Sequence, residues 1–145
     1  MTHLGFYTIS MLSNIPNLVY LAPTCKEEYL AMLDWSVDQD KYPVVISMPG
    51  NGVHPAKYPV ASSYDSLNEH QVCEKGEEVA GLALGDFFQL GEEAARSIEK
   101  ETGKKVTLIN PRFASGLDEK LLSDLKENHL TKELIMKDVM KLLHA

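Results

Sequence analysis

The sequence has few of the features that mark specialised classes of protein. Its 145 residues include only two cysteines, Cys25 and Cys73, and acidic residues outnumber basic ones by 21 to 14. Neither cysteine stands in a CxxC pair or near spaced histidines, which argues against a zinc site or a disulfide framework and favours a reducing, cytoplasmic setting. Because lysine and arginine are not clustered, we expect no binding to nucleic acid.

Long hydrophobic runs and the common site motifs are also missing from the sequence. Its apolar segments are far shorter than the ~20 residues that cross a bilayer, and no basic region followed by an apolar run begins it. We therefore expect no membrane contact and no signal peptide. The glycines do not fit a dinucleotide-binding or phosphate-loop pattern, and neither GxSxG nor HExxH occurs. The composition that remains is that of an acidic α/β protein.

The first half of the chain alternates strand and helix. Residues 18–22 and 43–48 are apolar and β-rich, and a helix is expected between them over residues 25–39. Thr24 is the expected N-cap of this helix, with Glu27 completing a capping box. The expected apolar face consists of Tyr29, Leu30, Met32, Leu33 and Val37.

The second half repeats the alternation after a stretch rich in Gly, Pro, Ser and Asn. We expect strands over residues 78–85 and 105–110, an edge strand over 71–74, and helices over 87–101, 117–127 and 131–143. One stripe is expected to form the apolar face of the helix 87–101: Phe87, Leu90, Ala94 and Ile98. The pattern predicts an α/β fold with two βαβ-type halves and mostly parallel sheets, the second half having few strands for its helices.

Four residues are candidates for a role on local grounds. His3 precedes Gly5 closely, so backbone could approach a ligand there while the imidazole donates a hydrogen bond or transfers a proton, although chance alone accounts for such a triplet more often than not. Arg112 follows a strand and could clamp an anion or form an ordinary ion pair. Asp86 lies in a strand-to-helix turn that could face a ligand or serve a structural role as a cap. Ser47 is typical of strand packing.

Three stretches stand out when they are taken together: THLGFYTISMLSNIPNLVYLAP, ISMPGNG and LALG…INPRF…GLDEKLL. In this order they resemble transketolase-type thiamine diphosphate enzymes, most closely the 1-deoxy-D-xylulose-5-phosphate synthases. The resemblance covers nearly the whole chain. It implies that residues 1–55 are the end of a pyrimidine-binding domain, that 56–76 are a linker, and that 77–145 are a shortened C-terminal domain.

The resemblance also implies roles for single residues. His3 matches a histidine of the family's active site, so it is the expected catalytic proton donor and substrate ligand. Ser47 and Gly50 stand where the family has arginine for the phosphate of the acceptor, so Ser47 is the candidate substrate-binding residue in its place. Thr8 stands where the family usually has aspartate. Arg112 belongs to a motif with a structural role at the domain junction and subunit interface.

The activity implied is that of a transferase of isoprenoid precursor biosynthesis, a carboligase that joins pyruvate to glyceraldehyde 3-phosphate. The family uses thiamine diphosphate and magnesium, but its activating glutamate and its GDG-type motif are not found in this sequence. We therefore expect no residue of this chain to bind the cofactor or a metal ion, and we expect the isolated chain to be inactive.

The same comparison of motifs implies a fragment that begins at an active-site loop and works in an assembly. The expected partner is a second copy, giving a homodimer, or a complementary transketolase-like chain, and a small-molecule substrate is expected only in the complete assembly. The alternative is a non-catalytic remnant or interaction module that self-associates or pairs with a full-length relative.

Overall fold

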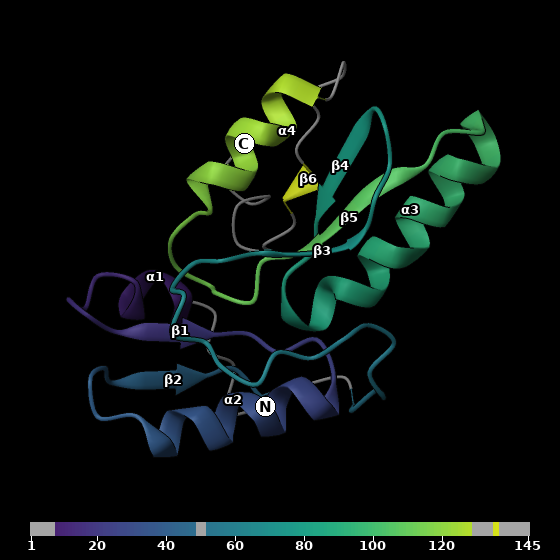
Figure 1. The fold of residues 1–145 in the computed structure, drawn as a ribbon. Helices are drawn as coiled ribbons and strands as arrows, with labels where there is room; N and C mark the ends of the chain where they lie inside the picture. Colours follow the sequence, from purple (N-terminus) through teal and green to yellow (C-terminus); the bar gives the residue numbers. More distant parts are fainter. Residues whose placement is uncertain (1–7, 49–51, 129–134, 137–145) are drawn as a thin grey trace.

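The computed structural model describes residues 8–48, 52–128 and 135–136. Figure 1 shows its elements in two groups, one from each half of the chain, which lie against each other. The short helix α1 (Thr8–Leu12) precedes the first group. None of the described helices is long and apolar enough to cross a membrane.

The first group is a strand–helix–strand unit. Strands β1 (Val19–Leu21) and β2 (Val44–Ile46) pair in parallel, and helix α2 (Lys26–Asp38) connects them. All three residues of β1 are buried, and they share a core with Met32 and Trp35 of α2. The elements expected over the first half are thus present, with boundaries one or two residues inside the expected ones.

The second group is a four-stranded sheet in the order β3-β5-β4-β6. Its strands are β3 (Gln71–Glu74), β4 (Val79–Leu82), β5 (Val106–Asn110) and β6 (Ile135–Met136). Strand β4 pairs in parallel with β5 and β6, whereas β3 is antiparallel to β5 at one edge. The predicted α/β class with mostly parallel sheets is confirmed, and so is the edge strand over residues 71–74.

Two helices cover opposite faces of this sheet. Leu121 and Leu125 of α4 (Glu119–Asn128) pack on a cluster that includes Leu82, while Phe88 of α3 (Phe88–Thr102) packs with Ala83. Successive residues of a strand point to opposite faces, so Leu82 and Ala83 mark the two sides. A 3-10 turn, η1 (Gly85–Phe87), leads from β4 into α3.

The helix expected over residues 131–143 is wrong where the structure describes it. Ile135 and Met136 form β6, paired in parallel with Gly81 and Leu82 of β4. The apolar periodicity of this segment was consistent with a helix, but β4 offers an unpaired backbone edge, and strand pairing satisfies its N–H and C=O groups. The sheet is therefore fuller than expected. The other residues of that predicted helix lie outside the described residues.

The predicted apolar face of α2 is confirmed only at Met32, and the predicted stripe of α3 is wrong. On α2 the buried residues are Glu28, Met32 and Trp35, whereas Leu33 and Val37 remain 40% and 76% exposed. Polar contacts of Glu28 and Trp35 turn that side of α2 inward, since Trp35 Nε1 donates to Asp65 and Glu28 meets Asn110.

On α3 the buried residues are Phe88, Glu92 and Ala95. Leu90 of the predicted apolar stripe is 45% exposed. Most residues of the two predicted apolar faces therefore lie outside the core.

The linker expected over residues 56–76 is packed along both halves. Tyr64 is only 2% exposed and lies edge-to-face against Trp35 of the first core, with ring centroids 6.0 Å apart. Tyr58 makes the same kind of contact with Phe88 of the second core, at 5.8 Å. The end of the segment forms β3. Each core thus receives an aromatic side chain from the connection between them.

The close packing of α3 on β4 gives a first prediction. A Cβ added at Gly91 would lie 2.4 Å from Cβ of Ala83, so Gly91→Ala forces the helix away from the strand. We expect a loss of about 1–3 kcal/mol from overpacking, which exceeds the ~1 kcal/mol that alanine gains over glycine in a helix. Urea denaturation measures the difference. Glu93→Ala, at an exposed position of the same helix, is the control, and a more stable Gly91→Ala protein would contradict the packing.

Candidate functional site

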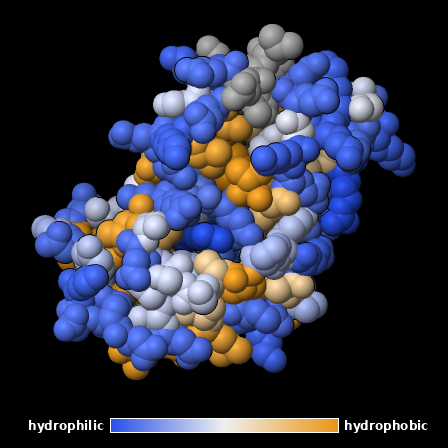
Figure 2. All heavy atoms as spheres, viewed as in Figure 1, coloured by the Kyte–Doolittle hydropathy of each residue, from blue (hydrophilic) through white to orange (hydrophobic). Residues whose placement is uncertain are grey.

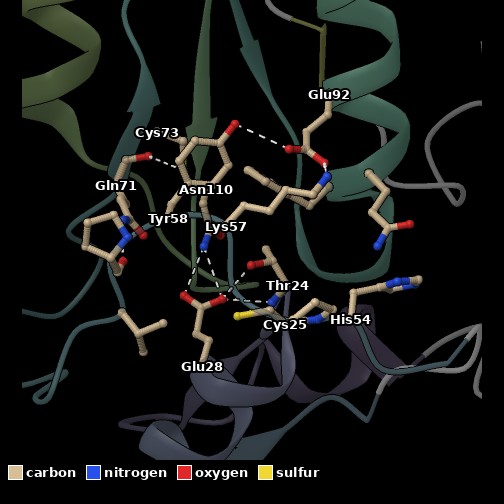
Figure 3. Close-up of a pocket in the computed structure, with 15 residues that line it drawn as sticks. Thr24, Cys25, Glu28, His54, Lys57, Tyr58, Gln71, Cys73, Glu92 and Asn110 are labelled. Carbon is tan, nitrogen blue, oxygen red and sulfur yellow. Dashed lines mark hydrogen bonds and ion pairs between the residues drawn. The ribbon is translucent and has the colours of Figure 1, made fainter.

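A buried carboxylate lies where the two halves meet. Glu28, in the first turn of α2, is 2% exposed. Its Oε2 accepts hydrogen bonds from both the backbone N–H and the hydroxyl of Thr24, each at 2.8 Å. From the second half, Nδ2 of Asn110 donates to Oε1 at 2.9 Å and approaches Oε2 at 3.2 Å. Figure 3 shows Glu28 pointing from α2 toward Asn110. One charged group therefore joins the end of β5 to the start of α2.

Arg112 completes this cluster. Its Nε lies 3.7 Å from Oε1 of Glu28, and its guanidinium carbon lies 5.9 Å from the centre of the Tyr64 ring. The backbone of Arg112 is in the left-handed region, with φ 63°, where residues other than glycine are rarely found. This conformation directs its N–H to Oδ1 of Asn110 at 3.0 Å, while its C=O accepts from the N–H of Ala22 at 2.8 Å. The turn after β5 is thus attached to the chain that follows β1.

A shallow pocket lies beside the cluster. It is lined by residues of α2, the linker, β3 and α3, including Cys25, Lys57, Tyr58, Cys73 and Glu92 (Figure 3). It encloses about 30 Å³, room for about two water molecules. A sugar phosphate or a cofactor is far larger. The pocket as described can hold solvent, and it cannot enclose a substrate of the size that the resemblance implies.

The charges in the pocket neutralise one another. Oε2 of Glu92, which is 3% exposed, lies 2.6 Å from Nζ of Lys57, and its Oε1 lies 3.6 Å from the Arg96 guanidinium. The hydroxyl of Tyr58 donates to Glu74 and to Glu92, the latter at 3.3 Å. Burial and these carboxylates raise the pKa of Tyr58. The tyrosine therefore stays protonated and acts as a donor that holds the linker to α3.

The two thiols of the pocket are poor nucleophiles. Burial raises the pKa of Cys73 to about 12, and burial, ahead of the nearby carboxylate of Glu28, raises the pKa of Cys25. Because the thiolate is the reactive form, neither cysteine is prepared for covalent catalysis at neutral pH.

His70 is another buried polar residue, and its ring makes no hydrogen bond to the described residues. It is 7% exposed. Its backbone N–H donates to Asp118 at the start of α4, at 3.0 Å. Burial lowers the pKa of the His70 imidazole; the nearby Asp118 carboxylate opposes this and Arg112 adds to it. The ring is therefore neutral at pH 7.

The structure describes three of the four residues singled out in the sequence, and it does not bring these three together. His3 lies outside the described residues. Ser47 directly follows β2, where its N–H donates to Leu21 at 2.8 Å, and it does not line the pocket. Asp86 is exposed in the η1 turn, and Phe87 rather than Asp86 occupies the N-cap position of α3. Of the three described candidates, Arg112 alone lies in the cluster, as an ion-pair partner of Glu28.

Glu28 is the central residue that the sequence analysis missed. The expected capping box is wrong, because Cys25 precedes α2 and it is Glu28, not Glu27, that reaches back to Thr24. Glu27 instead accepts from the N–H of Ala56 in the linker at 2.7 Å. A signal was available: Glu28, Met32 and Trp35 follow one another at helical spacing, a pattern that places the acid on the buried face.

The described residues do not fit thiamine diphosphate with magnesium. Magnesium requires carboxylate or diphosphate oxygens around it, whereas the buried carboxylates of Glu28 and Glu92 are already engaged by Thr24, Asn110, Lys57 and the arginines. Over residues 8–48, 52–128 and 135–136, no group of three or more His, Cys, Asp or Glu side chains could hold a metal ion. No step of a reaction is therefore assigned to the cofactor on this part of the chain.

Comparison with known proteins places this geometry in a family. No family model matches the chain. In three dimensions it superposes with a TM-score of 0.74 on a solved structure described as "split gene transketolase, inactive beta4 tetramer", at 21% identity over 91% of this chain and 42% of that one. The fold is therefore of the transketolase type.

Relatives found by sequence identify one group of enzymes within this fold. The chain is 32% identical over 137 residues to 1-deoxy-D-xylulose-5-phosphate synthase of Lachnoclostridium phytofermentans, and 31% identical over 141 residues to that of Shouchella clausii. These matches cover 88% and 97% of the chain but 20% and 22% of the relatives. The resemblance seen in the motifs is confirmed: the chain belongs to the transketolase-type family and is related to about a fifth of 1-deoxy-D-xylulose-5-phosphate synthase.

The cluster of Glu28, Asn110 and Arg112 gives a second prediction. Glu28→Ala leaves the Arg112 side chain, 14% exposed, without its counter-charge and removes the acceptor of Thr24 and Asn110. Breaking a buried pair in this way costs about 3–5 kcal/mol, and we expect a loss of that size in urea denaturation. Asp34→Ala, on the exposed side of α2, should change stability by less than about 0.5 kcal/mol. Equal effects of the two substitutions would show that the cluster does not hold the halves together.

His70 gives a third prediction. Because its pKa is lower in the folded protein than in the unfolded chain, protons bind preferentially to the unfolded chain. The stability that neutral His70 contributes is fully present above about pH 6.5, the unfolded value, and is lost as the pH falls through the folded-state pKa. We expect His70→Leu to reduce the decline in unfolding free energy between pH 7.5 and 5. His54→Leu, at an exposed position, should retain the full decline; an unchanged decline in His70→Leu would contradict the assignment.

Proposed function

We propose that the chain contributes part of a thiamine diphosphate-dependent, transketolase-like carboligase of the 1-deoxy-D-xylulose-5-phosphate synthase class, and that it is inactive by itself. Identities near 30% over most of the chain support the family, whereas the matched fifth of the relatives makes the full activity a proposal. In the complete assembly, pyruvate would be decarboxylated and its two-carbon unit added to glyceraldehyde 3-phosphate. The proposed setting is the cytoplasm.

One observation supports this proposal above the others. The two halves are joined by the buried Glu28–Asn110 hydrogen bonds and the Arg112 ion pair, yet the pocket between them encloses only about 30 Å³. The described residues thus keep the contact between the two halves, but the pocket at that contact has no room for a substrate. We infer that the substrate lies between this chain and a further polypeptide segment, which supplies the cofactor and magnesium.

Two residues have proposed roles in that assembly. His3 would donate a proton or a hydrogen bond to the substrate. Ser47 follows β2, at the carboxyl end of a parallel pair, where α/β sheets bind their ligands. Its hydroxyl would contact the acceptor in place of the family's arginine. Because a neutral hydroxyl binds phosphate more weakly than a guanidinium does, we expect an acceptor with less negative charge to be tolerated.

The proposed contact with a partner is the exposed face of α2. Leu30, Leu33 and Val37 are 45%, 40% and 76% exposed, and Figure 2 shows hydrophobic surface along the lower edge of the molecule, where α2 lies in Figure 1. Exposed apolar surface of this kind favours association. The partner would be a second copy or a complementary transketolase-like chain. Residues 1–55 and 77–145 would act as the pyrimidine-binding and C-terminal parts, with 56–76 linking them.

The same face also favours the alternative, a non-catalytic module that self-associates or pairs with a full-length relative. In that case Ser47 would have no ligand and α2 would remain the working surface. The two proposals differ in whether His3 matters, because an interaction module does not need an imidazole at that position.

Complementation separates the two functions. We expect no product from the purified chain with thiamine diphosphate, magnesium, pyruvate and glyceraldehyde 3-phosphate, and turnover when it is co-expressed with the Shouchella clausii synthase from which the matching segment has been deleted. His3→Ala should then lower turnover by about 10²–10⁴-fold, the size of general acid–base catalysis. His129→Ala serves as the matched control. Turnover by the isolated chain would refute the proposal that it is inactive by itself. Restored turnover that is insensitive to His3→Ala would refute the proposed catalytic role of His3.

Association through α2 is tested by sedimentation velocity at micromolar concentrations. We expect the wild-type chain to self-associate and the variant Leu33→Glu/Val37→Glu to be monomeric, because charge on an apolar contact must be desolvated. Asp34→Lys changes charge on the same helix without removing apolar surface. A strictly monomeric wild-type chain, if complementation also fails, would remove support from both functions.

A further inference from the structure

One edge of the first sheet is open. Among the described residues, β2 pairs with β1 alone, in parallel and without a bulge. The far edge of β1 is covered, because the C=O of Arg112 accepts from the N–H of Ala22 and the N–H of Ala114 donates to Tyr20. No described segment covers the far edge of β2 in this way. All three residues of β2 are only half-buried, whereas all three residues of β1 are buried.

Two residues of β2 present their backbone groups at this open edge. Alternate residues of a strand direct their N–H and C=O groups to opposite sides. The C=O of Pro43 accepts from Val19 at 2.9 Å and the N–H of Ser47 donates to Leu21 at 2.8 Å, so residues 43, 45 and 47 face β1. Val44 and Ile46 therefore face outward, without a backbone hydrogen bond to another described residue.

The edge lacks the devices that commonly prevent strands from pairing, which are charged side chains, proline and bulges. Pro43 precedes β2, but it faces β1 and removes no outward donor. The open stretch ends at Tyr42, because Oε1 of Gln39 accepts from the N–H of Tyr42 and Nε2 of Gln39 donates to its C=O, each at 2.8 Å. The edge is thus a short, neutral and apolar stretch centred on Val45.

We propose that β2 pairs with β2 of a second copy of this chain, antiparallel, with Val45 opposite Val45 of the other copy. In this register Val44 lies opposite Ile46 of the other copy, and Ile46 lies opposite Val44. Each of these pairs exchanges two hydrogen bonds, so every outward N–H and C=O group of both copies is satisfied. The product is an isologous dimer whose joined sheet has four strands, a common size.

Charge favours a second copy in this orientation. The exposed residues Asp38, Asp40 and Lys41 precede β2. In the antiparallel register they lie beyond Met48 of the other copy, away from their own counterparts. A parallel arrangement would instead set Asp40 beside Asp40 of the other copy, and like charges opposite each other destabilise a sheet.

The pairing of β2 also brings the two copies of α2 together. The two-fold axis of an antiparallel pair is perpendicular to the sheet, so both copies of α2 lie on the same face. Because α2 packs on both strands through Met32 and Trp35, about two strand spacings, about 10 Å, separate the two helices. Helices at this distance contact each other. The inference therefore rests on the proposed self-association and assigns it an interface, and it does not depend on catalytic activity.

Disulfide cross-linking tests the register. Val45→Cys, in a chain that also carries Cys25→Ser and Cys73→Ser, places two thiols at a non-hydrogen-bonded pair, where Cα atoms about 4.5 Å apart allow a disulfide. Met48→Cys is the matched control, because Met48 is 74% exposed yet lies about 20 Å from its counterpart in this register. We expect Val45→Cys to form a covalent dimer at least about tenfold faster, since pairing raises the effective concentration of its thiols.

Val37→Cys distinguishes this interface from a contact through the outward side of α2. Val37 is 76% exposed near the end of α2, and in the proposed dimer it lies more than about 15 Å from its counterpart. Cross-linking of Val37→Cys without cross-linking of Val45→Cys would overturn the pairing of β2 and leave the association through α2 in place. A chain that cross-links at neither position and sediments as a monomer would contradict both.

Amide hydrogen exchange in the unaltered chain gives a second test. Pairing removes the N–H groups of Val44 and Ile46 from water. Between about 30 μM and about 1 mM protein, we expect the exchange of these two amides to slow at least about threefold, because mass action raises the population of the dimer. The amide of Val45, which faces β1, should change less. Exchange of Val44 and Ile46 at the same rate at both concentrations would overturn the proposal.

Discussion

The fold depends on keeping one carboxylate out of water. Removing the charge of Glu28 from solvent costs several kcal/mol unless its oxygens are paired, and its partners come from both halves: Thr24 before α2, and Asn110 and Arg112 at the end of β5. If the second half shifted while the carboxylate stayed buried, Glu28 would lose Asn110 and Arg112 and keep only Thr24. The left-handed backbone of Arg112 is tolerated for the same reason, since a strained residue persists where the contacts around it fix its position.

Buried carboxylates and their partners determine which side of α2 and of α3 faces inward. Because Glu28 and Trp35 of α2 are held by polar partners, Leu33 and Val37 are turned outward. On α3, Glu92 is drawn inward by Lys57 of the linker, and the stripe that contains Leu90 lines a groove. The inward sides of both helices therefore carry a buried acid, and the outward sides carry apolar surface that remains available for contact.

The sequence could predict the parts of this arrangement that depend on local pattern. The β-rich runs 18–22 and 43–48, the helix between them and the stop of α3 at Gly103 follow from periodicity and backbone preference, and the INPRF motif placed Arg112 at a junction. The spacing of Glu28, Met32 and Trp35 indicated the buried face of α2, but the pairing of Glu28 with Asn110 could not be predicted, because the two residues are 82 positions apart. The strand β6 escaped prediction for a similar reason: Ile135 pairs where the edge of β4 is free, which periodicity cannot show.

The two tyrosines of the linker have a consequence for recognition. Tyr64 packs in the first core and Tyr58 packs against the second, so these contacts oppose a hinge motion of the connection and favour one mutual orientation of the outward faces of α2 and α3. A partner that contacts both halves meets a preorganised surface, so little conformational entropy is lost when it binds. Selectivity then follows from shape: a polypeptide whose complementary surfaces are set at another angle is excluded, however apolar it is.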